Sequence, residues 1–233
     1  MQSLHASNLY SFYGKSPVLQ GVSFDLGAGE FLAVLGRNGV GKTTLLKSIM
    51  GLTDRCGGGL RLGDGDIIGL PTTHRARRGI AYIPQGREII PRFTVRENIQ
   101  MGTFARADGR RDIPDYLFEL FPILREFLNR RGGDLSGGQQ QQLAIARALA
   151  SDPKVLILDE PTEGIQPNIV KQIEEAIIRL NRERGLSVIL VEQNIPFARA
   201  ASDRFLVLDK GRVVLAGRTD ELTDAVVEEH LTF

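Results

Sequence analysis

The sequence predicts an α/β fold: a parallel-sheet core with a small antiparallel β-subdomain, interrupted by an inserted helical subdomain. Three observations predict it. The apolar runs at residues 31–35, 155–158 and 188–191 are typical of buried parallel strands. A helical pattern fills residues 94–150, between the first of these strands and the other two. Alternating apolar and polar residues over positions 4–26 favour antiparallel strands with one covered face.

The small sheet is predicted mainly from the first third of the chain. Strands within residues 4–26 are expected to turn around residues 14–15 and again around 20–21. Residues 60–62 add a strand to this sheet, and the glycine-rich residues 56–59 before them are expected to form a turn. Most of the β-subdomain therefore precedes the helical insert.

The helical and C-terminal parts follow from residue spacing. Apolar residues recur at helical spacing over residues 113–128 and 138–149. Residues 167–184 are amphipathic and carry Pro167 near the first turn, a position that favours the start of a helix. The remaining predicted elements are a strand at residues 79–83, a hairpin of 204–208 and 212–215, and a last helix at 221–231.

Composition narrows the class of protein. The 233 residues suffice for one large α/β domain or for a domain with an inserted lobe. The 29 basic and 28 acidic residues give a net charge of +1, which favours neither nucleic acid nor an anionic membrane. The single cysteine, Cys56, cannot form an internal disulfide and suggests a reducing compartment. With no apolar run that spans a bilayer and no signal peptide, we expect a soluble protein unless a partner holds it to a membrane.

The strongest functional signal is the stretch from Gly36 to Thr44. It has the pattern G-x-x-x-x-G-K-[ST] and lies between a predicted strand and a predicted helix, which is the context of a phosphate-binding loop. Lys42 is expected to reach the β- and γ-phosphates, and Thr43 to ligate Mg²⁺. A simple glycine turn before a helix is the alternative, but strand, spacing, Lys and Thr all agree. The residues predicted to bind nucleotide here are Gly36, Arg37, Asn38, Gly39, Val40, Gly41, Lys42, Thr43 and Thr44.

Two carboxylates predict the second half of the site. Asp159 and Glu160 follow the apolar residues 155–158, and ligands bind beyond the carboxyl ends of strands in open α/β sheets. Asp159 is expected to hold Mg²⁺ together with Thr43. Glu160 is placed to polarise an attacking water, so we interpret it as the general base. The alternative is an exposed acidic turn after a core strand.

A second anion-binding segment is predicted at residues 135–139, Leu-Ser-Gly-Gly-Gln. Ser136 is placed to cap the helix that follows, and the paired glycines allow a phosphate to approach the backbone. The alternative, an N-capped helix with a glycine hinge, explains the same residues without a ligand.

In this order, the glycine loop, Gln85, residues 135–139 and the Asp159-Glu160 pair resemble an ABC-type ATPase, the nucleotide-binding subunit of an ABC transporter. The resemblance covers essentially the whole chain. It implies a P-loop NTPase (RecA-like) fold, ATP hydrolysis, and ATP and Mg²⁺ as ligands. It also implies a single domain, residues 1–233, in which 1–85 and 152–233 form the nucleotide-binding core with its β-subdomain and 86–151 form the helical signature subdomain.

The resemblance assigns further roles. Two ATPase subunits pack head to tail, so that Ser136 and Gly138 of one close on the γ-phosphate held by the other. Tyr13 is expected to stack on adenine, although a surface aromatic in a turn is the alternative. Gln85 is expected to sense Mg²⁺ as a ligand and to link the core to the helical lobe. The signature residues implied to bind nucleotide are Ser136, Gly137, Gly138 and Gln139.

Partners are also implied by the resemblance. They are a second ATPase subunit, transmembrane permease subunits and, through the complex, a solute-binding protein, with no nucleic acid. The expected place is the cytoplasmic face of the cell membrane. A heterodimer of ATPases is the default and a homodimer the alternative. The residues expected to meet a short helix of the permease, or else to serve ordinary packing of the lobe, are Arg87, Ile89, Ile90 and Phe93.

Two departures from the family pattern narrow the interpretation. Gln193 stands where a histidine usually contacts the γ-phosphate; its amide donates a hydrogen bond but cannot become cationic. Residues 163–167 lack the aspartate that many relatives carry. The Val-Glu-Gln ending at 191–193 is similar to the importer branch for hydrophobic amino acids and small amides. Within that branch, residues 82–91 and 159–167 are most similar to the ATPase subunit of urea uptake systems, with the branched-chain amino acid subunit second.

Three competing functions follow from the same residues. A weakly hydrolysing regulatory partner in a mixed ATPase dimer is consistent with Gln193 and the altered turn at 163–167. A soluble ABC ATPase that acts on DNA or ribosomes typically has a long coiled coil or two ATPase halves, and this chain has neither. A small-molecule kinase with a phosphate loop has no need of the segment at residues 135–139.

Overall fold

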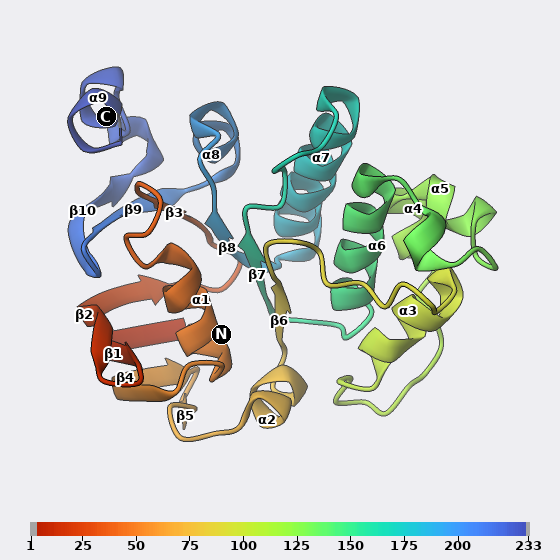
Figure 1. Cartoon of the computed structure of the whole chain (residues 1–233), viewed down its shortest axis with the longest axis horizontal. Coiled ribbons are helices and arrows are strands. Elements are labelled where there is room, and N and C mark those ends of the chain that lie inside the picture. Colours follow the sequence, from red (N-terminus) through yellow and green to blue (C-terminus); the bar gives the residue numbers. More distant parts are fainter. Residues whose placement is uncertain (1–3, 232–233) are drawn as a thin grey trace.

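Two β-sheets organise the chain in the computed structural model, which describes residues 4–231 (Figure 1). The larger sheet has the strand order β10-β9-β3-β8-β7-β6, and the smaller has the order β2-β1-β4-β5. All neighbours in the larger sheet are parallel except the antiparallel edge pair β9–β10. Its strands are β3 (Phe31–Leu35), β6 (Ile80–Ile83), β7 (Val155–Asp159), β8 (Ser187–Val191), β9 (Arg204–Asp209) and β10 (Arg212–Arg218).

The three central strands form the core of the molecule. Every residue of β3, β7 and β8 is buried, as the uninterrupted apolar runs predict for strands covered on both faces. The parallel pairing aligns their carboxyl ends at one edge: Val34 pairs with Val191, and Val191 pairs with Asp159. Whatever follows these three strands in the sequence is therefore brought together in space.

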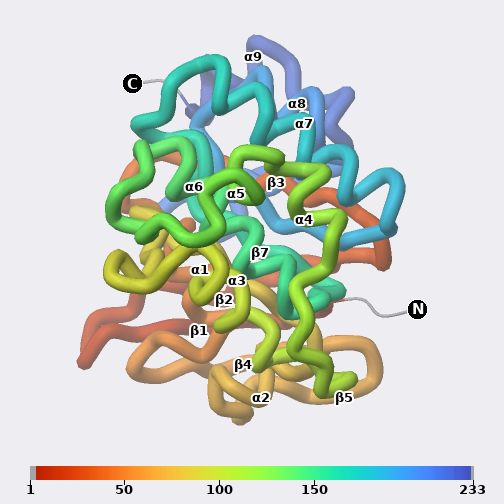
Figure 2. Tube along the Cα trace, turned by 90° about the vertical axis from the view of Figure 1, so that its right-hand side faces the viewer, coloured from red at the N-terminus to blue at the C-terminus, as the bar shows by residue number. Residues whose placement is uncertain are grey.

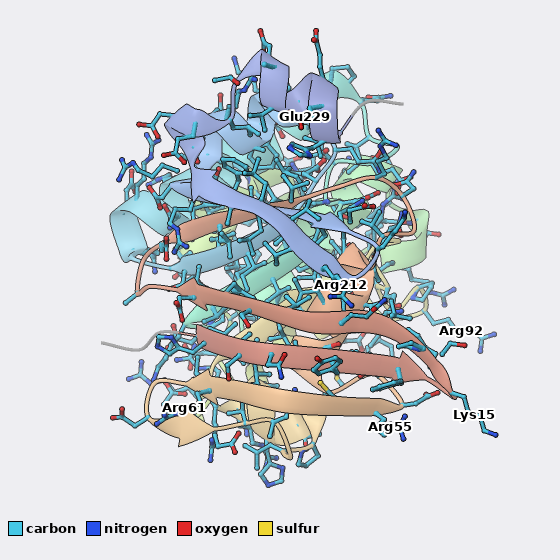
Figure 3. All side chains as sticks on the ribbon, turned by 90° about the vertical axis from the view of Figure 1, so that its left-hand side faces the viewer. Lys15, Arg55, Arg61, Arg92, Arg212 and Glu229 are labelled. Carbon is cyan, nitrogen blue, oxygen red and sulfur yellow. The ribbon has the colours of Figure 1, made fainter. Side chains whose placement is uncertain are left out.

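The small antiparallel sheet agrees with the prediction in part. Its strands are β1 (Leu4–Tyr13), β2 (Ser16–Leu26), β4 (Arg55–Leu62) and β5 (Gly65–Asp66), so the turn at residues 14–15 is confirmed. Figure 3 shows the outer face of this sheet, with Lys15 at the β1–β2 turn and Arg55 at the same end.

Two turns predicted in this sheet are wrong. Gly21 lies inside β2, where Leu9 pairs with Val22 and Tyr10 with Gln20, so the glycine forms a bulge instead of a turn. Residues 56–59 belong to β4. A Cβ on Gly58 would lie 2.2 Å from the Asn8 carbonyl oxygen, so the glycine is required by the close approach of β1.

Helices cover the larger sheet and form a group beside it. In Figure 1, α3 to α6 lie together on one side of the sheet, and they face the viewer in Figure 2. The run predicted at 113–128 is broken at Phe121-Pro122 into two short helices, because proline lacks the N–H that continues a helix. The prediction gave no elements for α2 and α8. The helices are α1 (Lys42–Met50), α2 (Thr72–Arg77), α3 (Val95–Thr103), α4 (Tyr116–Leu120), α5 (Pro122–Glu126), α6 (Gly137–Leu149), α7 (Pro167–Arg184), α8 (Ile195–Ala201) and α9 (Asp224–His230), with 3₁₀ turns at Gly132–Asp134 and Thr219–Glu221.

The apolar core has two large parts, one on each face of the larger sheet. One part joins the sheet to α6 and α7 through residues such as Leu143 and Ile177. The other lies between the two sheets, where α1 contributes Leu45, Leu46 and Ile49. Helix α1 is therefore fixed on both sides by apolar contacts. No helix within residues 4–231 is long and apolar enough to cross a membrane.

A buried arginine closes the C-terminal end of α1. Arg75 of α2 is 2% exposed and donates to four backbone carbonyls, those of Leu70, Ser48, Ile49 and Ile68, at 2.6–2.8 Å. Two of these carbonyls, those of Ser48 and Ile49, belong to the last turn of α1, where backbone hydrogen bonding is incomplete; the Ser48 carbonyl also accepts from the Gly51 N–H at 3.1 Å.

We expect Arg75→Leu to destabilise the fold, because four backbone carbonyls lose a charged donor, two of them in buried hydrogen bonds. The cost is about 3 kcal/mol or more, which lowers Tm by roughly 6–12 °C for a chain of this size. The control is Arg77→Leu on the same helix, where the side chain is exposed. Thermal unfolding of both variants checks this, and equal Tm values for the two would contradict the role of Arg75.

Candidate functional site

The glycine loop joins β3 to α1 and holds Lys42 across itself. Gly36 has φ of 145°, and a Cβ there would lie 2.4 Å from the Leu208 carbonyl oxygen, so only glycine fits. The Lys42 side chain is 5% exposed, and its Nζ donates to the carbonyls of Gly36 at 2.7 Å and Arg37 at 3.0 Å. Burial lowers the pKa of Lys42, while the Glu160 carboxylate, 3.8 Å away, acts to raise it.

The other predicted loop residues surround this lysine. Arg37, Asn38 and Gly39 form the exposed tip of the loop, and Val40 is half-buried. Gly41 precedes α1 with φ of 110°. Thr44 is buried and its carbonyl accepts a hydrogen bond from Ser48, so it lies inside the first turn of the helix.

Asp159 ends β7 with both carboxylate oxygens occupied. Oδ1 accepts from the Thr43 hydroxyl at 3.1 Å, and Oδ2 accepts from the Tyr82 hydroxyl at 3.2 Å. Burial raises the pKa of Asp159, and the two hydrogen bonds act against that rise. Tyr82 was not predicted as a site residue. Burial and the neighbouring Asp159 charge raise the pKa of its phenol, so Tyr82 is a hydrogen-bond donor at this edge.

Glu160 is the point where the predicted catalytic residues meet. Its Oε1 accepts from Gln193 Nε2 at 2.9 Å, and its Oε2 accepts from Gln85 Nε2 at 3.4 Å. The backbone of Glu160 has φ of 47°, a left-handed conformation that costs about 1–3 kcal/mol in a residue other than glycine. Strain of this kind persists only where surrounding contacts hold it.

Glu163 is a second carboxylate beside Glu160 in the cavity of Lys42. Its Oε2 accepts from Gln85 Nε2 at 2.8 Å, so Gln85 bridges Glu160 and Glu163. The sequence singled out residue 163 only as part of an altered turn. The cavity has a volume of about 290 Å³ and is lined by Val18, Asn38, Gly39, Gly41, Lys42, Thr43, Thr44, Gln85, Glu160, Glu163 and Gln193.

Nine predicted residues are not among those that line this cavity: Gly36, Arg37, Val40 and Asp159, which lie next to lining residues, and Tyr13, Ser136, Gly137, Gly138 and Gln139. Tyr13 ends β1 with 39% of its surface exposed. Ser136 begins α6 and is exposed. Its hydroxyl accepts from the Gln139 backbone N–H at 3.4 Å, and the Gln139 side chain accepts from the Ser136 N–H at 3.0 Å, which forms a capping box. Gly137 and Gly138 follow Ser136 in the first turn of α6.

The glycines of α6 pack closely against neighbouring elements. A Cβ on Gly137 would lie 2.9 Å from Arg87 Nη1, and one on Gly138 would lie 2.8 Å from Ile169. Residues 136–139 thus present backbone and a hydroxyl on the surface at a helix N-terminus, apart from the cavity that holds Lys42.

The oxygen donors at the cavity fit a magnesium ion bound with phosphate. Within residues 4–231, no group of three or more His, Cys, Asp or Glu side chains is placed to hold a metal ion by itself. Thr43 and Asp159 offer two hard oxygen atoms, 3.1 Å apart. Mg²⁺ commonly takes one or two protein oxygens and completes its shell with phosphate oxygens and water.

The comparisons with known proteins decide the family. A family model described as ABC transporter matches residues 19–163. The chain belongs to the ABC transporter family. The high-affinity branched-chain amino acid transport ATP-binding protein BraG of Pseudomonas aeruginosa is 44% identical over 206 residues, 88% of each chain.

Other relatives of this ABC protein are similar over almost the full chain. The probable branched-chain amino acid transport ATP-binding protein LivF of Archaeoglobus fulgidus is 38% identical, covering 95% of this chain and 94% of the relative. The lipopolysaccharide export system ATP-binding protein LptB of Escherichia coli is 35% identical, covering 99% and 95%.

Solved structures confirm the predicted fold class. An ATP-binding cassette of an ABC transporter in its ADP conformation has a TM-score of 0.80 and 26% identity, covering 98% of both chains. A dimeric cassette in a post-hydrolysis state with ADP and phosphate has a TM-score of 0.81 and 26% identity, covering 93% and 98%. ABC ATPases bind ATP and hydrolyse it to drive transport, and they function as dimers with permease partners. The chain is an ATPase subunit of this kind.

Gln193 provides a direct test of the geometry around Glu160. We expect Gln193→Ala to lower the steady-state ATPase rate by about tenfold or more, because Glu160 loses a positioned donor. Gln193→His is expected to keep activity but to add a step in the pH–rate profile between about pH 6 and 7, since imidazole titrates there.

The matched control is Gln100→Ala, which removes an exposed glutamine side chain on α3. ATPase assays on the purified chain compare the three variants. An unchanged rate in Gln193→Ala would remove Gln193 from the catalytic residues.

Proposed function

We propose that this ABC ATPase powers uptake of a small solute by closing on a second ATPase subunit around ATP. The observation that carries the proposal is the separation of two anion-binding features. Lys42 and Thr43 line one cavity and Asp159 is bonded to Thr43 beside it, whereas Ser136 caps an exposed helix end that does not line this cavity. A head-to-tail partner would supply its own helix end to this cavity and receive that of the present chain.

The residues of the cavity have distinct proposed roles. Lys42 and the backbone N–H groups of residues 36–44 bind the β- and γ-phosphates. Thr43 and Asp159 hold Mg²⁺, which supplies charge neutralisation on the phosphate oxygens. Glu160 orients and deprotonates the attacking water, with Gln193 fixing its carboxylate.

Gln85 and Tyr13 have proposed contacts at either end of the nucleotide. The side-chain oxygen of Gln85 would hold Mg²⁺, which would require the amide to leave Glu163. Tyr13 stacks on adenine; its position at the exposed end of β1, next to the turn that carries Lys15, supports this role (Figure 3). Gly137 and Gln139 act with Ser136 and Gly138 on the partner's nucleotide.

A groove beside the cavity supports a permease contact. It has a volume of about 380 Å³ and lies between β6 with α2 on one side and α3 with α6 on the other. Of the predicted coupling residues, Arg87 and Ile90 line it, Phe93 is 38% exposed, and Ile89 packs on the core. Permease attachment at this groove would place the ATPase at the cytoplasmic face of the membrane, with a solute-binding protein on the other side.

The proposed cargo is a branched-chain or other hydrophobic amino acid. Two relatives at 44% and 38% identity carry branched-chain amino acid transport in their names, which supports this choice. Urea is the second candidate, since residues 82–91 and 159–167 are most similar to urea uptake ATPases. The relatives named above do not support urea, and one at 35% identity serves lipopolysaccharide export.

The catalytic proposal is tested by two variants that fail in different ways. Glu160→Gln should retain ATP binding, trap the dimer and lower turnover by about 10²–10⁴, because the base is lost while the phosphate contacts remain. Lys42→Ala should weaken ATP binding itself. Glu175→Gln, an exposed carboxylate on α7, is the matched control.

The measurements are ATP titration, ATP-dependent dimerisation by light scattering, and steady-state hydrolysis, with and without a partner ATPase. Wild-type turnover of Glu160→Gln would exclude it as the base. Turnover near zero in the wild-type chain, restored only by the partner, would favour the regulatory alternative.

The cargo is tested by uptake. The chain, co-purified with its permease subunits and reconstituted in vesicles with the solute-binding protein, is given radiolabelled leucine or radiolabelled urea. We expect ATP-dependent accumulation of leucine that is abolished by Glu160→Gln. Accumulation of urea alone would replace the amino acid by urea, and accumulation of neither would overturn both.

A further inference from the structure

Glu192 is a buried carboxylate between the two loops that carry Glu160 and Gln193. It is 4% exposed, and each of its two carboxylate oxygens accepts two hydrogen bonds. Oε1 accepts from the Thr162 hydroxyl at 2.6 Å and from the Thr162 N–H at 3.3 Å. Oε2 accepts from the N–H groups of Gln193 at 2.9 Å and Asn194 at 3.2 Å. Each oxygen of Glu192 therefore accepts hydrogen bonds from a different loop.

These contacts of Glu192 restrain both loops that form the hydrogen bond between Gln193 Nε2 and Glu160 Oε1. Thr162 lies two residues after Glu160, and the backbone of Gln193 is held directly. The two loops come from sequence positions 30 residues apart, and β7 and β8 bring them together only as far as the strand ends. Beyond the strands, Glu192 joins the two loops side by side, so its position bears on the 2.9 Å distance between Gln193 Nε2 and Glu160 Oε1.

Energetics favour a positioning role for this carboxylate. A buried carboxylate is costly unless hydrogen bonds satisfy it, and here four donors do so. Glu160 also has the left-handed φ of 47°, which requires its surroundings to hold it. The loop that carries Gln193 has one further contact, because Asn194 Nδ2 donates to Glu174 Oε1 at 3.2 Å.

We propose that Glu192 is a positioning residue for ATP hydrolysis: it clamps the loop of Thr162 to the loop of Gln193 and so sets the position of the Glu160 carboxylate. This inference rests on the proposed role of Glu160 as the base. Glu192 does not line the cavity of Lys42, and it is not among the residues proposed to contact the nucleotide. It acts through the two loops, and its loss should affect the chemical step more than binding of ATP.

The test is Glu192→Gln, which keeps the size of the side chain. The NH₂ group of the new amide then replaces one carboxylate oxygen and faces a backbone N–H, which cannot accept a hydrogen bond. At least one contact between the two loops is therefore lost. We expect kcat to fall by about tenfold or more while KM and the affinity for ATP change by less than about threefold. Glu174→Gln is the matched control, because Glu174 contacts Asn194 through its side chain only and is bonded to neither Thr162 nor Gln193.

Thr162 supplies a second test that does not depend on the folding of Glu192→Gln. Thr162→Val removes the hydroxyl donor and should lower kcat in the same way, whereas Thr162→Ser keeps the hydroxyl and should restore it. The double variant Glu192→Gln/Thr162→Val should be no slower than the slower single variant, because both remove one contact.

The outcomes separate this inference from the proposed function. If Glu160→Gln is slow but Glu192→Gln has the wild-type kcat, the clamp is overturned and the base stands. If Glu160→Gln turns over normally, the base assignment fails, and the clamp as stated fails with it. If Thr162→Ser is as slow as Thr162→Val, or if Glu192→Gln loses ATP affinity together with kcat, Glu192 supports the fold and does not position Glu160.

Discussion

The parallel pairing of three buried strands is the constraint on which the rest of the structure depends. Val34 of β3, Val191 of β8 and Asp159 of β7 lie in one row across the sheet. The chain leaves each strand at the same edge, so the glycine loop, the Glu192-Gln193 segment and Glu160 all begin at that edge. The apolar cores on both faces of the sheet hold this row in place, and a shift of one residue in any strand would separate the three segments.

Charge explains how the cavity selects its ligand. Glu160 and Glu163 line the cavity together with the buried Lys42, and Asp159 is bonded to Thr43 beside it, so an anionic nucleotide alone would meet more carboxylate than ammonium. A divalent cation held by Thr43 and Asp159, as proposed, would offset this excess and would make binding of the nucleotide and of the metal interdependent. Gln193 adds a donor without adding charge, so this contact to Glu160 does not depend on the protonation state of a histidine.

Local sequence signals predicted most helices and strands correctly. They failed for residues whose conformation or role depends on contacts with distant parts of the chain. The glycine loop, the buried strands and the helix at 167–184 are confirmed, because each depends on spacing within a few residues. Gly21 and residues 56–59 were interpreted as turns, since a glycine in a strand has the same local signal as one in a turn. Tyr82, Glu163 and Glu192 were missed as members of the site, because their partners lie 30 to 78 residues away and no local pattern indicates them. The roles of the site residues stay predictions.

The segment after β6 connects the cavity to the proposed permease groove. Gln85 contacts Glu163 in the cavity, and Arg87, two residues later, lines the groove. The three consecutive residues Gly86, Arg87 and Glu88 all have positive φ, at 88°, 73° and 47°. Two of these are not glycine, so the segment stores backbone strain, and Arg147 of α6 holds it by donating to the Glu88 carbonyl at 2.8 Å. In the proposed cycle, release of Gln85 from Glu163 would act on this strained segment and, through Arg147, on α6. The groove and the N-terminal end of α6, which we propose to meet the second subunit, would then respond to the same event.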